Sequence, residues 1–351
     1  MRSTVLRSSV AAATALLLVT GSAASARIRP PERAINATRF IAANQTSDGS
    51  FEGSFSPIGT AADAVVALSA ARRAPGTIDA ALDYLETNVD DADTVGLKSK
   101  VVMAAVAGGR DPRAFGGRDL VKEIRESVGE DGQYGEHTNA PGDPEVFDHA
   151  LAILALAGAG EGIVPEQVFT WLISAQCDDG GWQFDDPAGE NDDNHCHDGT
   201  EGDFSRSDTN TTAIAVQALQ VAVDSRRPPV SPFRFFAKTR DPEKRGWGYD
   251  LTLNLTDANS TALVIQAHVA VGRDLPRGAM RALTRLQYPN CGDNAGAFAF
   301  TWERDASGSG ELRRGEPNVA ATIGAVLGLL RQPLPLPRVA ATKPPPRSRP
   351  C

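Results

Sequence analysis

The stretch Thr170-Trp-Leu-Ile-Ser-Ala-Gln-Cys-Asp-Asp-Gly-Gly-Trp182 has the pattern of a helix that ends at a glutamine and is followed by a Gly-aromatic turn. Arg39-Phe-Ile-Ala-Ala-Asn-Gln-Thr-Ser-Asp-Gly-Ser-Phe51 follows the same pattern. Weaker copies occur at residues 121–134, 235–247 and 282–298. Self-similarity at a regular interval is typical of repeat proteins, and the interval here is roughly 50 residues. The chain is therefore predicted to consist of stacked copies of one structural unit.

A second kind of segment follows each of these and begins with polar residues. Its clearest copies are Ser207-Asp-Thr-Asn-Thr-Thr-Ala-Ile-Ala-Val-Gln-Ala-Leu219 and Thr256-Asp-Ala-Asn-Ser-Thr-Ala-Leu-Val-Ile-Gln-Ala-His268. The same type recurs at residues 59–71, 97–107, 144–156 and 316–329. Asp, Ser, Thr and Asn cap helices because they accept hydrogen bonds from free N–H groups of the first turn. Apolar residues then run almost all round the segment, which predicts a helix buried on most sides.

Each unit is thus an outer, partly charged helix paired with an inner, buried helix. Six such pairs are expected within a repeat domain of residues 27–332, at 32–74, 77–110, 118–160, 165–223, 231–272 and 276–331. Helix pairs can stack as an open solenoid or close into a ring. Closure is favoured because a ring leaves no terminal repeat exposed. We therefore predict an all-α fold, an α6/α6 toroid around a central cavity.

The segment Gln176-Cys-Asp-Asp-Gly-Gly-Trp182 resembles the Q-x-x-x-G-x-W motif of the prenyltransferase/squalene-oxidase repeat. That repeat builds the α/α toroids of squalene–hopene cyclases and protein prenyltransferase β-subunits, and the chain also resembles the toroid of cobalamin carriers. The resemblance implies that Gln176 and Trp182, and likewise Gln45 and Phe51, tie the end of an outer helix to the neighbouring pair. It implies the fold more firmly than a function, because one fold hosts several activities.

Squalene-type cyclases protonate an alkene with a carboxylic acid in a D-x-D-D motif, and this sequence contains no such motif. They also stabilise carbocations with aromatic faces. Only 6% of this chain is aromatic, and Phe147 is the one aromatic residue in the six inner segments. A cyclase is therefore the less favoured hypothesis, and in that case Asp208 or Asp257 would have to be the acid.

Protein prenyltransferases bind zinc through a D-x-C motif near the start of an inner helix. The corresponding stretches here are Asp208-Thr-Asn210 and Asp257-Ala-Asn259, in which asparagine replaces the thiolate ligand. No zinc site and no other cofactor are predicted, because the soft ligand is missing. The insertion of residues 178–208 holds eleven acids and also His195-Cys-His197. It is interpreted as a solvated acidic loop, with a Ca²⁺ site as the alternative.

The chain has four cysteines. Cys177 and Cys196 lie 19 residues apart, which suits a disulfide bond that closes the acidic loop. The pairing of Cys291 and Cys351 is left open.

The polar starts of the inner helices supply the candidate site. If all inner helices point the same way, their N-termini meet at one rim of the ring, and each contributes polar side chains above an apolar pit, the usual form of a small-molecule site. Taken singly, each of these residues is an ordinary helix cap. The candidate ligand-binding residues are Asp63, Asp148, His149, Asp208, Asn210, Asp257, Asn259, Glu316 and Asn318.

The two ends of the chain differ from the repeats. Residues 1–26 have the pattern of a cleaved signal peptide, with Arg2 and Arg7, an apolar stretch at 10–19 and Ala24-Ser25-Ala26. No later stretch is apolar enough for a membrane span. Residues 333–351 are Pro-rich and poor in apolar side chains, and are predicted to form a disordered tail. The net charge of −9 argues against nucleic-acid binding.

These observations favour a secreted, non-catalytic toroid that binds a small or lipid-like ligand, or a protein partner, at the mouth of its cavity. A divergent terpenoid cyclase or mutase is the alternative. A structural scaffold that binds no ligand is a third hypothesis.

Overall fold

The computed structural model describes residues 32–51, 56–135, 145–161, 164–185, 196, 206–221, 227–304 and 311–347. These residues contain twelve α-helices in six consecutive pairs. The first members of the pairs are α1 (Glu32–Ala43), α3 (Pro75–Thr87), α5 (Leu120–Glu126), α7 (Glu166–Ser174), α10 (Pro232–Lys238) and α12 (Ala279–Arg285). The second members are α2 (Pro57–Ala71), α4 (Val95–Gly108), α6 (Val146–Gly158), α9 (Thr209–Gln220), α11 (Ala258–Ala270) and α13 (Val319–Leu330).

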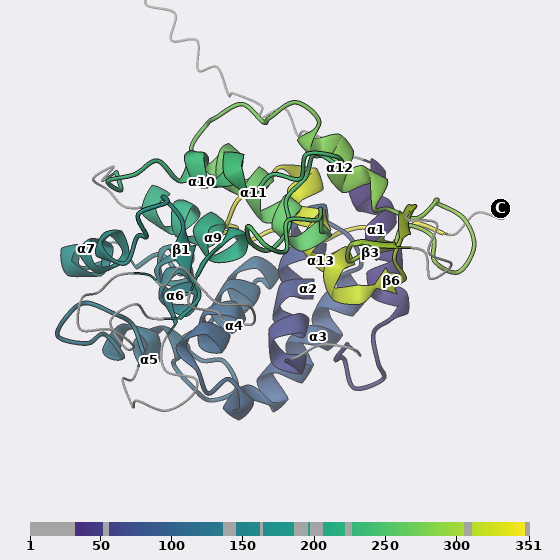
Figure 1. The fold of residues 1–351 in the computed structure, drawn as a ribbon. Helices are drawn as coiled ribbons and strands as arrows, with labels where there is room; N and C mark the ends of the chain where they lie inside the picture. Colours follow the sequence, from purple (N-terminus) through teal and green to yellow (C-terminus); the bar gives the residue numbers. More distant parts are fainter. Residues whose placement is uncertain are drawn as a thin grey trace, which may run out of the picture.

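The second helices of the pairs form a closed inner ring. Each contacts the next in the order α2, α4, α6, α9, α11, α13, and α13 packs against α2. The first helices lie outside this ring, as Figure 1 shows, with α3 against α2 and α1 against α13. The predicted all-α toroid with an inner and an outer layer is confirmed.

The inner helices can approach closely because their contact faces are made of small residues. A Cβ atom added at Gly328 of α13 would lie 2.7 Å from the Cβ of Ala262 on α11. In all of the inner helices except α6, the side chain of the polar residue that precedes the helix caps its first turn. Asp208 Oδ1 accepts from the backbone N of Asn210 and of Thr211, both at 2.8 Å. These caps fix where each inner helix begins and therefore set the height of the rim.

A glutamine at the end of an outer helix joins one helix pair to the next. Gln45 Nε2 donates to the carbonyl oxygens of Gly49, in its own turn, and Thr77, in the following pair, at 3.0 and 2.9 Å. Gln176 Nε2 makes the same two bonds, to Gly180 and to Val230. These residues were chosen from the repeat motif, and their bonds cross from one pair to its neighbour.

The ring closes with the same bond. Gln287 Nε2, at the end of α12, donates to the carbonyl oxygens of Gly296 (3.2 Å) and Arg33 (2.8 Å). Arg33 lies on α1, so this glutamine links the last pair to the first. Arg33 Nη1 returns a hydrogen bond to Gln287 Oε1 at 3.1 Å. The junction between the two ends of the repeat array therefore reproduces the junctions within it.

The strands in the described residues are short and form two-stranded antiparallel sheets. β1 (Trp182–Gln183) pairs with β2 (Ser207–Asp208), and β3 (Phe298–Ala299) pairs with β6 (Pro317–Asn318). β4 (Trp302–Arg304) pairs with β5 (Leu312–Arg314). The first two pairs hold the start of an inner helix, α9 or α13, against the turn that follows an outer helix.

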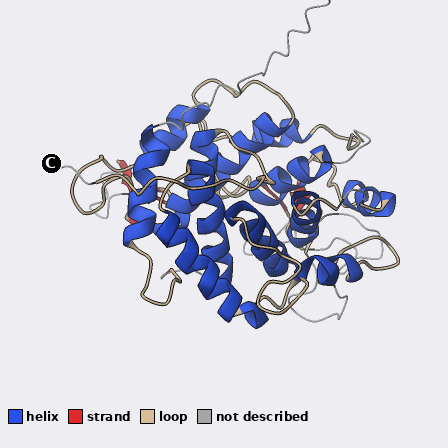
Figure 2. Cartoon of the chain, turned by 180° about the vertical axis from the view of Figure 1, so that it is seen from behind, coloured by secondary structure: helices blue, strands red, loops and turns tan. Residues whose placement is uncertain are grey.

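The segment after α13 differs from the prediction of a disordered tail. Residues 333–347, here called the C-terminal strap, run in an extended conformation across the ends of the inner helices (Figure 2). Leu334 N donates to Gln217 Oε1 at 2.9 Å, Val339 N to the Ala107 carbonyl at 3.1 Å, and Ala74 N to the Lys343 carbonyl at 2.8 Å. Leu336 is buried. The prediction from composition was wrong because prolines already restrict the unfolded chain, so the strap loses little conformational entropy when it becomes ordered. The burial of one or two leucines is then enough to hold it on the ring.

The predicted Cys177–Cys196 disulfide is confirmed. Cys291 is also disulfide-bonded, whereas Cys351 lies outside the described residues. The segment assigned to a signal peptide lies outside them as well. Among the helices that the structure describes, none combines the length and apolar character needed to cross a membrane.

Candidate functional site in the central cavity

A cavity of about 290 Å³ lies inside the ring, and all six inner helices contribute to its wall. Its apolar lining includes Val66, Met103, Leu151, Ile214, Leu263, Ile323 and Leu327. Leu334 of the C-terminal strap also lines it. The volume lies at the lower end of the range of known ligand sites, roughly 300–1,000 Å³. The cavity therefore suits one small molecule.

Four oxygen atoms in the cavity wall are buried and have no hydrogen-bond partner among the described residues. They are Asp208 Oδ2, Asn210 Oδ1, Asn259 Oδ1 and Gln266 Oε1. The Gln266 amide is oriented by its Nε2, which donates to the Ala262 carbonyl at 3.3 Å. The matching residue of the preceding repeat, Gln217, uses its Oε1 to accept from Leu334 N. Unpaired buried acceptors are costly, and any hydrogen-bond donor inside the cavity, from a water or a ligand, would lower that cost.

Asp63, Lys100 and Asp208 are the charged residues that line the cavity, whereas Asp148 and Glu145 lie outside its lining. Lys100 Nζ is 2.8 Å from Asp63 Oδ2. Burial alone would lower the pKa of Lys100, but the charge of Asp63 and its hydrogen bond outweigh burial and raise that pKa. Burial raises the pKa of Asp148, whose Oδ2 accepts from Gly96 N at 3.1 Å. Burial, and then the charge of Asp148, raises the pKa of Glu145 to about 8.

Asp208 is, with Asp63, one of the two carboxyl groups that line the cavity. It is 1% solvent-exposed, and burial raises its pKa from 3.8 to about 7. Tyr249 also lines the cavity, and burial, followed by the charge of Asp208, raises the pKa of its phenol. Asp208 thus holds a proton up to near neutral pH, at the top of an apolar pit.

The raised pKa of Asp208 should make stability depend on pH. Between pH 4 and 7 the folded chain keeps a proton on Asp208 that the unfolded chain has released. The contribution of this carboxyl group to stability is therefore complete below about pH 4 and is lost as pH rises through 7. Asp208→Asn keeps the cap but removes the titration. Urea denaturation at several pH values measures the free energy of unfolding. In the variant this free energy should fall less steeply with rising pH than in the unchanged protein, by up to about 1.4 kcal/mol per pH unit.

The half-exposed cap Asp119, whose Oδ1 accepts from Lys122 N at 2.9 Å, provides the matched control. Asp119→Asn makes the same replacement at a cap that does not line the cavity, and its slope is the reference with which the Asp208→Asn slope is compared. An Asp208→Asn variant with the original slope would contradict the assignment.

The candidate residues chosen from the sequence fall into two groups. Asp63, Asp208, Asn210 and Asn259 line the cavity together. Asp257 does not, because its two oxygens accept from Ser260 N and Ser260 Oγ, each at 2.7 Å. Of the two candidate acids, only Asp208 is therefore placed to act on a molecule inside the ring.

Asp148, His149, Glu316 and Asn318 are also outside the lining of the cavity. His149 is fully buried between α6 and α7, where its Nδ1 accepts from Tyr134 N at 3.0 Å and its Nε2 lies 3.1 Å from the Val168 carbonyl. Burial lowers its pKa to about 3, so it is a neutral core residue. Two positions along the helix from Phe147, it faces the opposite side. Glu316 is exposed, and Asn318 caps α13 through Ala321 N.

Sequence reasoning missed Lys100, Gln266, Phe184 and Tyr249 in the cavity wall. Lys100 could have been noticed as a cation inside a segment predicted to be buried, and Gln266 as a polar residue at the same position in two repeats. Phe184, whose ring stacks on Phe147 at 5.8 Å, and Tyr249 come from loops without a pattern.

No group of three or more His, Cys, Asp or Glu side chains in the described part of the chain is placed to hold a metal ion. Residues 186–195 and 197–205 of the acidic insertion, where the Ca²⁺ alternative falls, lie outside that part.

The ring, its two helical layers and its central cavity define the class of α/α toroids, and comparison with solved structures agrees. A type II terpene cyclase from Scytonema superposes with a TM-score of 0.58 at 13% identity, over 86% of this chain and 97% of that one. Unsaturated glucuronyl hydrolase from Bacillus sp. GL1 gives 0.57 at 14% identity, over 86% and 96%. A protein from Actinoplanes gives 0.55 at 16% identity, over 86% and 98%.

No family model and no curated protein matches the chain. The likeness to these solved structures, at 13–16% identity, concerns the α/α-toroid fold alone.

Proposed function

We propose that this protein is an exported, non-catalytic binding protein that holds one small amphipathic molecule in its central cavity. The apolar part of the ligand lies between the inner helices, and its polar end donates hydrogen bonds at the rim. The observation that carries the proposal is the set of four unpaired acceptor atoms above an apolar pit.

The surroundings of Asp208 support a binding role. Protonation of an alkene needs a strong acid, whereas burial has made Asp208 a weaker acid than an ordinary aspartic acid. A protonated Asp208 can both donate and accept hydrogen bonds, which suits a neutral hydroxyl or amine. One of the similar structures is a terpene cyclase variant in complex with geranylgeranyl dihydroxybenzoate, which has an apolar chain and a polar head. A ligand of that general design is what we propose here.

Export is supported by the signal-peptide pattern of residues 1–26 and by the disulfide bonds. Disulfides form and persist in oxidising compartments.

A neutral fluorescent amine tests the binding function. N-phenyl-1-naphthylamine has an apolar body and one N–H donor, and we expect it to bind with a saturable rise in fluorescence at one molecule per chain. Leu263→Trp places a large side chain in the cavity wall and should weaken this binding at least tenfold. The same replacement at Leu253, which is 64% exposed, is the matched control and should leave binding unchanged. Equal binding by the two variants would refute the proposal.

Acid-catalysed conversion of a terpenoid is the second candidate function. It is favoured by one observation: Asp208 shares the cavity with three aromatic residues, Phe147, Phe184 and Tyr249, rather than the single one expected from the sequence. Purified protein can be incubated with farnesol, geranylgeraniol and squalene, and the products analysed by mass spectrometry. A product that is formed by the unchanged protein but not by Asp208→Asn would replace the binding role with catalysis.

A further inference from the structure

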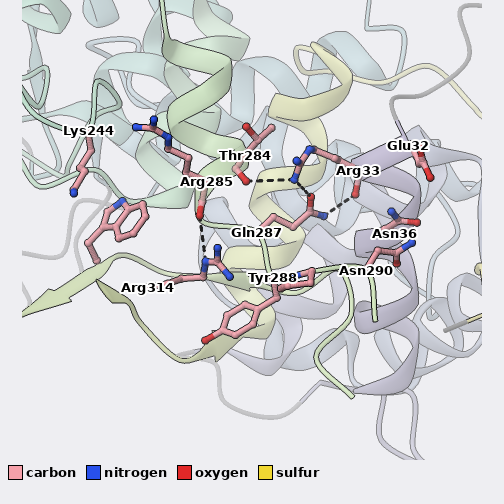
Figure 3. A pocket seen from close by; sticks show the side chains of 12 residues that line it. Glu32, Arg33, Asn36, Lys244, Thr284, Arg285, Gln287, Tyr288, Asn290 and Arg314 are labelled. Carbon is pink, nitrogen blue, oxygen red and sulfur yellow. Dashed lines mark hydrogen bonds between the residues drawn. The ribbon is translucent and has the colours of Figure 1, made fainter. Parts of the chain in front are cut away.

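A second, larger hollow of about 740 Å³ lies on the outside of the ring, at the junction between the last and first helix pairs. Its walls come from α1, from α12 and the chain that follows it, and from β4 and β5 (Figure 3). It shares no lining residue with the central cavity. We call it the basic groove, and it is lined by Glu32, Arg33, Asn36, Lys244, Thr284, Arg285, Gln287, Tyr288, Pro289, Asn290, Trp302 and Arg314.

The basic groove carries four cations and one acid, on a chain whose net charge is −9. Arg33, Lys244, Arg285 and Arg314 form no ion pair with a carboxylate among the described residues. Some arginines elsewhere on the surface are paired, as Arg113 Nη2 is with Glu161 Oε1 at 2.7 Å, whereas others, such as Arg39, donate to a backbone carbonyl. Glu32 is the acid of the lining, and burial, followed by the charges of Glu316 and Glu303, raises the pKa of Tyr288. The four cations still outnumber the acid of the lining, and a bound anion would relieve the repulsion among them.

Neutral contacts hold two of these side chains in place. Arg33 Nη1 donates to Gln287 Oε1 (3.1 Å) and to the Thr284 carbonyl (3.4 Å), as Figure 3 shows. Arg314 Nε donates to the Arg285 carbonyl at 3.1 Å. Because these acceptors are uncharged, the guanidinium groups keep their full charge and have further N–H donors for a ligand.

Two of the cations also lie over aromatic rings. The Arg314 guanidinium carbon is 4.9 Å from the centre of the Tyr288 ring, and Lys244 Nζ is 4.8 Å from that of Trp302. These contacts restrict long, flexible side chains before any ligand arrives, which lowers the entropic cost of binding.

The positive charge continues beyond the groove along α12. An adjoining hollow of about 480 Å³ shares Lys244 and Arg285 with the groove and adds Arg245, Arg277, Arg281 and Arg331. A single small anion would need only one or two of these side chains. A row of cations along two joined hollows matches an elongated ligand with several anionic groups.

We propose that the basic groove is a binding site for an elongated, multiply charged anion, with two or more phosphate, sulfate or carboxylate groups. Arg33 and Arg314 would bind the anionic groups through guanidinium N–H donors, and Lys244 and Arg285 would extend the contact toward α12. The site is independent of the central cavity, and its failure would leave the proposed function untouched.

Isothermal titration calorimetry with tripolyphosphate at low ionic strength tests this site. We expect saturable binding at one molecule per chain that weakens as salt is added. Arg314→Ala and Lys244→Ala should each lower the affinity at least tenfold, and Arg314→Lys, which keeps the charge, should lose less. Arg234→Ala and Lys238→Ala remove exposed cations of α10 outside the groove and should change the affinity less than twofold.

Parallel titrations with citrate and with a sulfated disaccharide identify the anionic group that the groove prefers. Binding of N-phenyl-1-naphthylamine should stay unchanged in the groove variants, which shows that they fold and that the sites are separate. Absence of saturable binding with all three anions would overturn the proposal. An equal loss of affinity in the α10 variants would also overturn the proposal, because the anion would then be attracted by surface cations in general rather than by the groove.

Discussion

Replacement of Trp182 by alanine should lower the free energy of unfolding by about 3–5 kcal/mol. The indole is fully buried, and its Nε1 donates to the Leu172 carbonyl of α7 at 2.7 Å. The backbone N of the same residue donates to Thr212 Oγ1 of α9 at 2.9 Å. β1 then pairs Trp182 with Asp208, the cap of α9. One residue thus binds an outer helix through its side chain, and an inner helix and the rim of the cavity through its backbone.

Trp182→Phe separates the contribution of the buried aromatic area from that of the indole hydrogen bond. It keeps most of the buried area and loses the indole hydrogen bond, so the expected loss is smaller, about 1–3 kcal/mol. Phe300→Ala is the control, because Phe300 is 46% exposed and its removal leaves no cavity. Urea denaturation followed by circular dichroism gives all three values. A Trp182→Ala variant as stable as Phe300→Ala would show that the turn after α7 does not hold the ring together.

The second large effect is expected at the C-terminal strap. Leu336→Ala should cost about 2–5 kcal/mol, because Leu336 is 3% exposed and packs against the hydrophobic core. The change should also loosen the strap, whose remaining anchors are hydrogen bonds and the partly buried side chains of Leu334 and Ala341. Limited proteolysis should then cut within residues 333–347 faster than in the unchanged protein, and mass spectrometry can identify the fragments.

Leu253→Ala is the matched control for the strap, since Leu253 is exposed. It should change neither the midpoint of unfolding nor the rate of cleavage. If Leu336→Ala behaved in the same way, the strap would be resting on the ring without stabilising it.

The architecture could be predicted because it repeats. A cap, an apolar helix and a Gln-Gly-aromatic turn recur at regular intervals, and each copy supports the interpretation of the others. The segments at residues 170–182 and 207–219 define one complete unit. The spacing between copies of this unit along the chain predicted the boundaries of the remaining pairs.

The candidate site was predicted less well because its decisive features do not repeat. Asp208 and Asp257 occupy the same position in two repeats, yet the structure gives them different environments. Ser260 donates its hydroxyl to Asp257, whereas Asp208, which has threonine at the matching position, keeps Oδ2 without a partner. The two loop aromatics of the cavity and the whole basic groove arise where segments distant in the sequence meet.

The hydrogen bond from Gln287 to Arg33 also affects how the protein unfolds. In an open helical solenoid the outermost repeats have one neighbour each, so they fray first and unfolding spreads inward. Here every repeat has two neighbours, and loss of any one breaks two junctions at once. The six pairs should therefore melt together in one sharp, all-or-none transition, with no partly unfolded intermediate.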